Sequence, residues 1–114
     1  MLKKILMGSA LLSASFFVNA GKTNNAIIDQ LMVDEEYGMV FIRAIGDTEN
    51  QPECSGNGQW SYVLPLNSEI QKGTMTSFLL SAYMGGKRIQ LIGKNSCDTF
   101  SSIETLKRIE FVSQ

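Results

Sequence analysis

The clearest hydrophobic pattern in the chain is a helical one over residues 74–87. Its apolar side chains recur at i, i+3, i+4, i+7 and i+8, which places them on one stripe of an α-helix: Met75, Phe78, Leu79, Ala82 and Tyr83. Thr74 is the predicted N-cap, and Gly85-Gly86 supplies the left-handed residue at which helices commonly end. The pattern predicts one amphipathic helix that must cover another part of the chain.

Five other segments have the alternation or the β-branched composition that is typical of strands: 26–33, 39–45, 60–66, 88–92 and 103–112. The first two indicate an antiparallel hairpin whose turn contains Gly38, a residue that can take a positive φ. In the third, alternation places Trp60 on the same face as Tyr62 and Leu64. Pro65 lacks a donor N–H and predicts that this strand ends there or lies at a sheet edge.

The predicted order of elements is therefore β-β-β-α-β-β, in a mainly β fold with one helix (α+β). This order favours a five-stranded, OB-fold-like, partly open barrel. The alternative is a helix lying flat on an open antiparallel sheet. Residues 21–25 are polar and are expected to be frayed, and residues 46–59 form a loop longer than most connections in compact domains.

The first twenty residues have the features of an export signal. Lys3 and Lys4 precede an apolar run over 5–18, and Val18-Asn19-Ala20 is a small-residue cleavage site. The apolar run is shorter than the roughly 20 residues of a membrane-spanning helix, which disfavours a retained anchor. The sequence predicts a cleaved signal peptide over 1–20, a single domain over 21–114 with no membrane span, and a periplasmic or secreted protein.

Charge and cysteine content narrow the function classes. Without Lys3 and Lys4 the chain has 8 basic and 11 acidic residues, a net charge of −3, and no basic run, which argues against a nucleic-acid partner. In an oxidising compartment Cys54 and Cys97 are expected to form a disulfide rather than free thiols or an intermolecular bridge. The bridge would enclose 43 residues and contribute about 4 kcal/mol by chain entropy.

Catalytic groups are scarce. The sequence has no histidine, which excludes Ser-His-Asp and Cys-His arrangements and imidazole zinc sites. Residues 56–58 (GNG) precede a strand rather than a helix, so they indicate a turn and not a phosphate loop. Acidic residues at 34–36 and at Asp47, Glu49 and Glu53 leave glycoside hydrolysis or calcium open, but acidic side chains in turns are usually just solvated. We expect no catalytic residue, no metal and no cofactor.

Three residues are candidates for binding. Tyr37 lies in a predicted turn, where an aromatic ring is not needed for the core. Trp60 would pack in the core or, alternatively, offer a stacking platform for a sugar ring. Arg43 shares a strand face with Met39 and Phe41, where it could snorkel, pair with an acid or point into a subunit interface.

The second half of the chain also carries a recurring arrangement of motifs. A loop cysteine, Cys54, is followed by an aromatic strand over 60–64 (WSYVL), a helix end over 79–87 (LLSAYMGGK), a strand over 89–91 (IQL) and Cys97. Over residues 39–112 this arrangement resembles the B subunits of subtilase-cytotoxin and pertussis-like toxins. The resemblance implies an OB-fold chain that assembles as a pentameric ring and binds host glycans. The shared motifs are structural and assign no glycan-binding residue.

The leading hypothesis is an exported, non-enzymatic binding module of the toxin-B-subunit type, with a glycan or a protein as its partner. A second hypothesis is a periplasmic structural or inhibitory protein that acts through a sheet edge. The third is an enzyme that uses acidic residues alone, for which Glu35 and Glu53 are the candidates.

Overall fold

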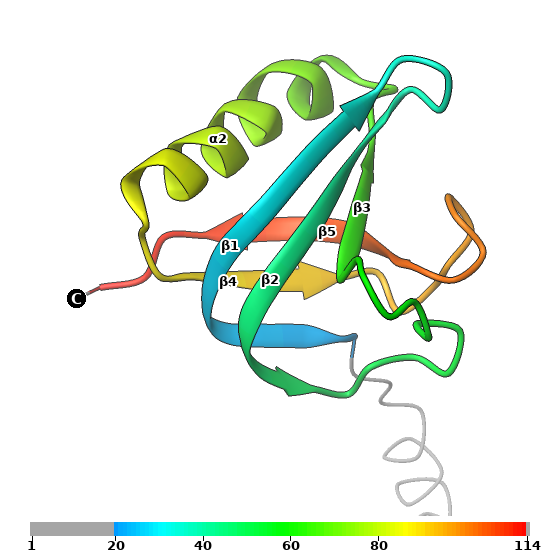
Figure 1. The fold of residues 1–114 in the computed structure, drawn as a ribbon, viewed down its shortest axis with the longest axis horizontal. Coiled ribbons are helices and arrows are strands. Elements are labelled where there is room, and N and C mark those ends of the chain that lie inside the picture. Colours follow the sequence, from blue (N-terminus) through cyan, green and yellow to red (C-terminus); the bar gives the residue numbers. More distant parts are fainter. Residues whose placement is uncertain (1–19, 114) are drawn as a thin grey trace, which may run out of the picture.

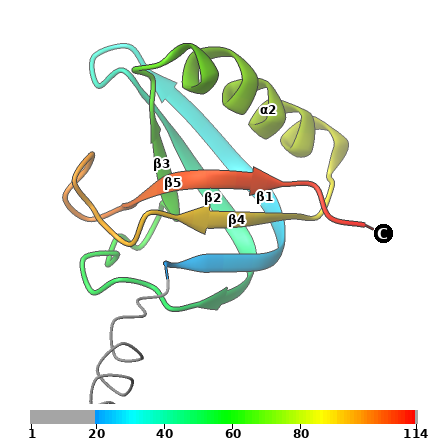
Figure 2. The ribbon, with the colours of Figure 1, turned by 180° about the vertical axis from the view of Figure 1, so that it is seen from behind.

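A computed structural model describes residues 20–113, and the predicted signal peptide, apart from Ala20, lies outside them. The elements are β1 (Lys22–Asp34), β2 (Met39–Glu49), β3 (Tyr62–Pro65), a π-helical turn η1 (Ile70–Met75), α2 (Thr76–Gly85), β4 (Ile89–Gly93) and β5 (Glu104–Glu110). The five strands close into a barrel in the order β1-β2-β3-β5-β4 (Figures 1 and 2). No helix in the described part is long and apolar enough to cross a membrane.

The barrel closes because β1 pairs with two strands. It is antiparallel to β2 along most of its length and antiparallel to β4 near its beginning, while β3 and β5 pair in parallel. The register of β1 shifts between Asn24 and Ile27, and such bulges let a long strand curve. Figure 1 shows this curvature in both β1 and β2. The predicted OB-fold-like barrel is confirmed, and the flat sheet is wrong.

The main core fills the inside of the barrel. Its buried side chains come from all five strands and from α2: Ala26, Ile28, Val40, Ile42, Tyr62, Leu64, Leu79, Ala82, Ile89, Leu91 and Leu106. In Figures 1 and 2 the helix lies diagonally across one end of the barrel. The buried face of α2 is narrower than predicted, because Phe78 and Tyr83 are 45% and 42% exposed.

The helical segment begins earlier than the hydrophobic pattern indicates, and the predicted cap at Thr74 is wrong. Ser68 Oγ accepts the Gln71 N–H at 3.2 Å, and Gln71 Oε1 accepts the Ser68 N–H at 3.1 Å. This reciprocal pair is a capping box, which satisfies free N–H groups at a helix start. The end is as predicted: Gly86 has φ 61°, and the Lys87 N–H donates to Ala82 O at 3.1 Å.

The beginning of the domain is ordered, so the expected fraying of residues 21–25 is wrong. β1 starts at Lys22, which pairs with both Glu49 and Ile92. Thr23 is 1% exposed, and its hydroxyl lies 2.9 Å from the hydroxyl of Tyr62. A polar side chain can be buried here because a buried phenol is its hydrogen-bond partner.

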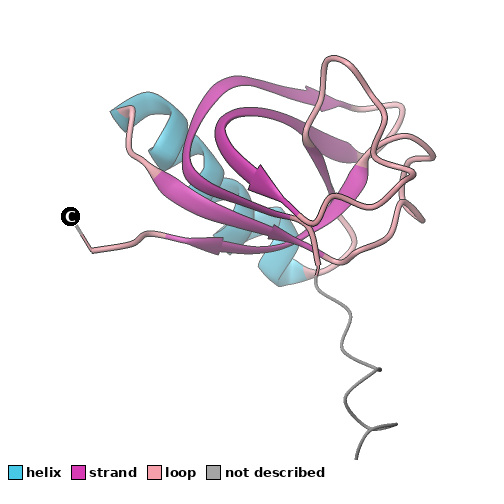
Figure 3. Ribbon diagram, turned by 90° about the horizontal axis from the view of Figure 1, so that it is seen from below, coloured by secondary structure: helices cyan, strands magenta, loops and turns pink. Residues whose placement is uncertain are grey.

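One predicted turn, one predicted strand end and the disulfide are confirmed. Gly38 has φ 65° in the β1–β2 turn, and β3 ends at Pro65. Cys54 and Cys97 are bonded, with their Cα atoms 6.1 Å apart. The bond joins the β2–β3 loop to the β4–β5 loop, and Figure 3 shows the long loops gathered at one side of the barrel, away from α2.

Candidate functional site: an outer cavity beside β2

A second, smaller hydrophobic cluster lies outside the barrel wall, where the disulfide joins the two loops. Phe41, Val63 and Ile103 are its buried members. The rings of Phe100 and Trp60 lie 5.4 and 5.6 Å from that of Phe41, at distances typical of aromatic pairs. The cluster covers the outer side of β2 and β3 with the loop that contains Cys97.

Trp60 belongs to this outer cluster, so its predicted placement on the face of Tyr62 and Leu64 is wrong. β3 begins only at Tyr62, and Trp60 still lies in the preceding turn. The side-chain oxygen of Asn57 accepts the N–H groups of Gln59 and Trp60, both at 2.9 Å. Because this turn interrupts the strand, its alternation does not extend back to Trp60.

Tyr37 lies at the opposite end of the outer cluster. Its ring makes edge contacts with Phe41 and Phe100, each at 5.9 Å, and the side chain is 56% exposed. The neighbouring turn is fixed by Asp34, whose carboxylate accepts the N–H groups of Glu36 and Tyr37. Tyr37 is therefore an exposed aromatic side chain, as predicted, on a defined backbone.

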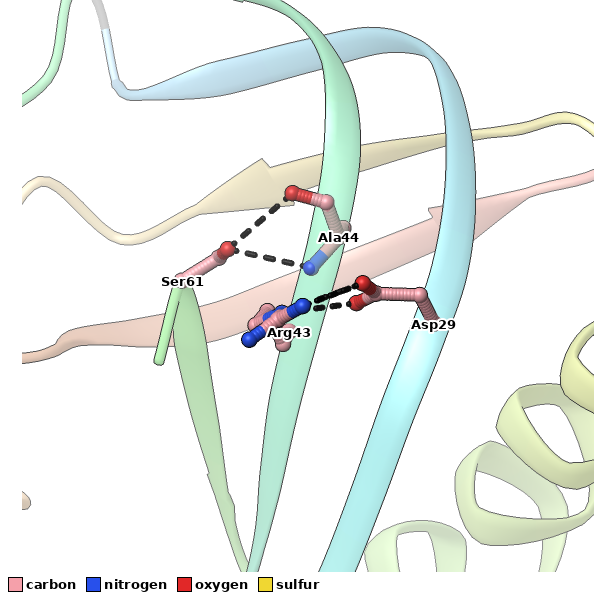
Figure 4. Close-up of polar contacts among 4 residues, drawn as sticks. All are labelled: Asp29, Arg43, Ala44 and Ser61. Atoms are coloured by element: carbon pink, nitrogen blue, oxygen red, sulfur yellow. Dashed lines mark hydrogen bonds and ion pairs between the residues drawn. The ribbon is translucent and has the colours of Figure 1, made fainter. Parts of the chain in front are cut away.

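Arg43 pairs with an acid, which was one of its three predicted alternatives. Its Nε donates to both carboxylate oxygens of Asp29 at 3.0 and 3.1 Å, and its Nη2 donates to Oδ2 at 2.7 Å (Figure 4). This two-pronged contact fixes a planar guanidinium more tightly than a single bond would. The hydrogen bond from Arg43 and the negative charge of Asp29 raise the pKa of Arg43.

Beside Arg43, the edge of β2 separates from β3. Ser61 N–H donates to Ile42 O at 2.8 Å, and Ser61 Oγ bonds to both the N–H and the carbonyl of Ala44 (Figure 4). Pairing between β2 and β3 stops at Ile42, whereas β2 continues to Glu49. Within residues 20–113, no strand pairs with the outer edge of β2 beyond Ala44.

An open cavity of about 400 Å³ lies at this edge. Most of its wall is amide, hydroxyl or backbone, with one indole and one guanidinium: Thr23, Arg43, Ala44, Ile45, Thr48, Gln51, Ser55, Asn57, Gly58, Gln59, Trp60 and Ser61. Beneath it, burial raises the pKa of the Tyr62 phenol, and hydrogen bonds with Thr23 and Gln51 oppose part of that rise. The phenol is thus a neutral hydrogen-bonding group in the pH range of most compartments.

The structure brings two of the three predicted binding residues together. Arg43 and Trp60 line the same cavity, whereas Tyr37 lies in the β1–β2 turn and does not line it. Gln51 and Gln59 also line the cavity, and nothing in the sequence marks them, because amide side chains in a loop have no distinguishing pattern. Asn57 lies in the 56–58 segment that the sequence predicts as a turn, and its side chain accepts the N–H of Trp60.

No acidic residue of the described part of the chain lines this cavity. Glu35 and Glu36 are exposed in the β1–β2 turn, and Glu49 makes a 3.6 Å ion pair with Lys22. In the part of the chain that is described, no group of three or more acidic or cysteine side chains could hold a metal ion. The cavity can therefore offer hydrogen bonds, one positive charge and one aromatic surface.

No protein-family model matches this chain, and no curated protein is similar to it in sequence.

Proposed function

We propose that this protein is an exported, non-enzymatic binding module, similar to a toxin B subunit, that binds a glycan or a protein partner in the outer cavity. The observation that supports this is the composition of the cavity wall, where Trp60 and Arg43 flank several amide and hydroxyl groups. Sugars present hydroxyl groups together with apolar ring faces. Amides satisfy the first and an indole packs against the second.

The fixed position of Arg43 supports a binding role further. Asp29 holds the guanidinium by Nε and Nη2, and Nη1 has no hydrogen-bond partner among residues 20–113. A ligand would meet a donor whose orientation is already set, which lowers the entropy that binding must remove. The OB-fold also places its loops beside the faces that bind oligosaccharides in other barrels of this class.

Export and assembly are part of the same proposal. The disulfide fits an oxidising compartment, such as the periplasm or the extracellular space. Apolar side chains remain exposed on and near the helix: Ile70, Phe78, Leu80, Tyr83, Met84 and Phe111. A surface of this kind is common at interfaces between subunits, which supports a homo-oligomer, a pentameric ring in the toxin-like version.

A glycan array combined with native mass spectrometry tests the proposal on the processed, oxidised protein. We expect binding by an oligomer, weakened about threefold to tenfold in Gln59→Ala, which removes one amide from the cavity. Gln30→Ala is the matched control, because that amide lies on β1 outside the cavity. A monomer that binds no glycan at about 1 mM would contradict the toxin-like version.

The free edge of β2 favours a second candidate function, the capture of a partner strand. The carbonyl of Ile42 and both backbone groups of Ala44 bond to Ser61, so they point away from β1. Backbone groups of every second residue in a strand point to the same side, and the N–H of Thr48 is therefore also expected to point away from β1. A partner strand could add there by main-chain hydrogen bonds. Thr48→Pro removes that N–H and should abolish capture of a periplasmic partner, whereas Thr48→Val should retain it.

A further inference from the structure

Glu104 is the least compensated polar group in the interior of the barrel. The residue is 0% exposed, and its Oε1 has no hydrogen-bond partner. Its Oε2 accepts two backbone N–H groups, from Gly21 at 3.0 Å and from Asn95 at 2.9 Å. The ion pairs of the described residues join Lys22 to Glu49 and Arg43 to Asp29, so none includes Glu104. A carboxylate in this position needs a positive charge or a proton.

The surrounding backbone is shaped to hold this carboxylate. A Cβ atom on Gly21 or on Gly93 would overlap the carboxylate of Glu104, so a side chain at either position would force that carboxylate to move. The two glycines are joined by the Gly93 N–H, which donates to Gly21 O at 2.8 Å. Asn95 takes a left-handed backbone conformation, with φ 62°, and directs its N–H to the carboxylate. Two segments of the chain, the beginning of the domain and the end of β4 with the loop after it, thus converge on one side chain.

Gly21 is also the residue that follows the predicted cleavage site Val18-Asn19-Ala20. We propose that removal of the leader at the Ala20–Gly21 bond converts the Gly21 nitrogen into an α-ammonium that forms a buried ion pair with Glu104. The processed protein then has a positive charge beside Glu104, whereas the uncleaved chain has an uncharged amide at the same place. The inference does not depend on which ligand the outer cavity binds.

The chemistry of this step is peptide hydrolysis by a signal peptidase, with water as the second reactant. The water oxygen bonds to the carbonyl carbon of Ala20, the C–N bond breaks, and the nitrogen of Gly21 takes up protons to become an ammonium. The new carboxyl group leaves with the signal peptide. The nitrogen changes from one N–H donor to three, which is enough to reach Oε1 as well as Oε2 of Glu104.

The proposed ion pair can form only if cleavage leaves Gly21 as the first residue. With one residue more at the N-terminus, the nitrogen of Gly21 would remain an uncharged amide. With one residue fewer, Gly21 and its donor would be absent. Burial raises the pKa of Glu104 while Gly21 is an amide, and a neighbouring ammonium would act in the opposite direction by favouring the carboxylate.

Two lysines are the alternative source of positive charge. Lys94 and Lys107 border an open pocket of about 470 Å³ together with Ala20, Gly93 and Asn95. Both lysines are exposed, and neither forms an ion pair with Glu104. Their replacement therefore separates a general effect of nearby charge from a specific effect of the Gly21 nitrogen.

The experiment compares two forms of the protein, both exported with the leader and recovered from the periplasm in the oxidised state. One has the natural sequence, and the other has a single alanine inserted between Ala20 and Gly21. Intact mass spectrometry should show that the natural protein begins at Gly21. The inserted form, which begins with the extra alanine, should melt about 5 °C lower or more. Lys94→Gln and Lys107→Gln should each change Tm by about 1 °C or less.

A second readout is the reactivity of the α-amine. An amine-selective label at pH 7 should modify the natural folded protein about tenfold more slowly than the inserted form, and equally fast after unfolding in urea. In the Glu104→Gln variant, the alanine insertion should lower Tm by less than it does in the natural sequence, because the carboxylate that pairs with the ammonium is absent. If Glu104→Gln does not fold, the comparison of the two N-terminal forms still decides.

Three results would each overturn the proposal. The first is a mature N-terminus at a residue other than Gly21. The second is equal labelling of the folded natural and inserted forms, which would mean that the ammonium is free in solvent. The third is an equal Tm for the two forms, which would mean that Glu104 gains nothing from the charge. Loss of glycan binding alone would bear on the outer cavity and not on this ion pair.

Discussion

The outer face of β1 and β2 and the interior around Glu104 each hold a carboxylate, but in opposite ways. Asp29 accepts three hydrogen bonds from a half-exposed arginine, whereas Glu104 is buried and accepts only backbone N–H groups. Water screens the first pair and weakens it, while the second carboxylate has no solvent to stabilise its charge. The Arg43–Asp29 pair can therefore change with little effect on folding. The interior site tolerates little change.

The largest expected effect on stability comes from the disulfide, which joins the long loops on the outer side of the barrel. Replacing Cys54 and Cys97 together by serine should lower the free energy of unfolding by about 4 kcal/mol, because the unfolded chain regains the entropy of a 43-residue loop. Urea unfolding of the variant and of the oxidised natural protein measures this. A loss below about 1 kcal/mol would mean that the outer cluster of Phe41 and Trp60 holds the loops without the bond.

The next effect belongs to the interior. Gly93→Ala should destabilise the protein by about 3 kcal/mol, because the new methyl group overlaps the buried Glu104 carboxylate and would displace it from its two N–H donors. Gly58→Ala is the matched control, since a Cβ there meets nothing within 4 Å, and it should change stability by about 0.5 kcal/mol or less. Similar values for the two variants would show that the carboxylate is free to relocate.

A pH series sharpens the comparison within the interior site. While Gly21 is an amide, burial raises the pKa of Glu104 above 4.5, so the folded state binds its proton more tightly than the unfolded state does. Stability of the alanine-inserted form should then fall as pH rises above 4.5. In the processed form the ammonium favours the carboxylate, and the fall should shrink or reverse. Tyr62, Lys94 and Lys107 are the other titratable groups nearby, and they are common to both forms.

The smallest expected effect on stability is that of Arg43→Gln. The Arg43–Asp29 pair is exposed to solvent, so its loss should shift Tm by about 2 °C or less. The same variant should weaken a ligand of the outer cavity about tenfold, since a charged donor is removed. A large fall in Tm with unchanged binding would reverse the proposed roles of the two regions.

The parts of the fold that were predicted depend on local pattern and chemistry. The order of strands and helix follows from hydrophobic periodicity. Glycine marks the turn at Gly38 and the helix end at Gly86, and the two cysteines mark the disulfide. The apolar stripe alone predicts too late a helix start, because the capping box of Ser68 and Gln71 is a polar signal that lies before the stripe.

The parts that were not predicted depend on contacts between residues distant in sequence. Residues 21–25 look frayed by composition, yet Thr23 is buried against Tyr62, which lies 39 positions away. Strand alternation predicts Trp60 on the core face only if the strand continues back to it. The turn formed by Asn57 lies there instead. Glu104 carries no signal in the sequence, since the atoms that surround it come from Gly21, Gly93 and Asn95.

The outer cavity beside β2 is the proposed binding surface, and Trp60 reports on it directly because it is the only tryptophan in the sequence. Fluorescence titration of the processed protein with glycans selected on the array tests the claim. We predict a saturable change in emission whose midpoint matches the affinity from native mass spectrometry, and a midpoint about tenfold higher in Arg43→Gln. Binding that leaves the emission of Trp60 unchanged would place the ligand outside this cavity and contradict the proposed binding surface.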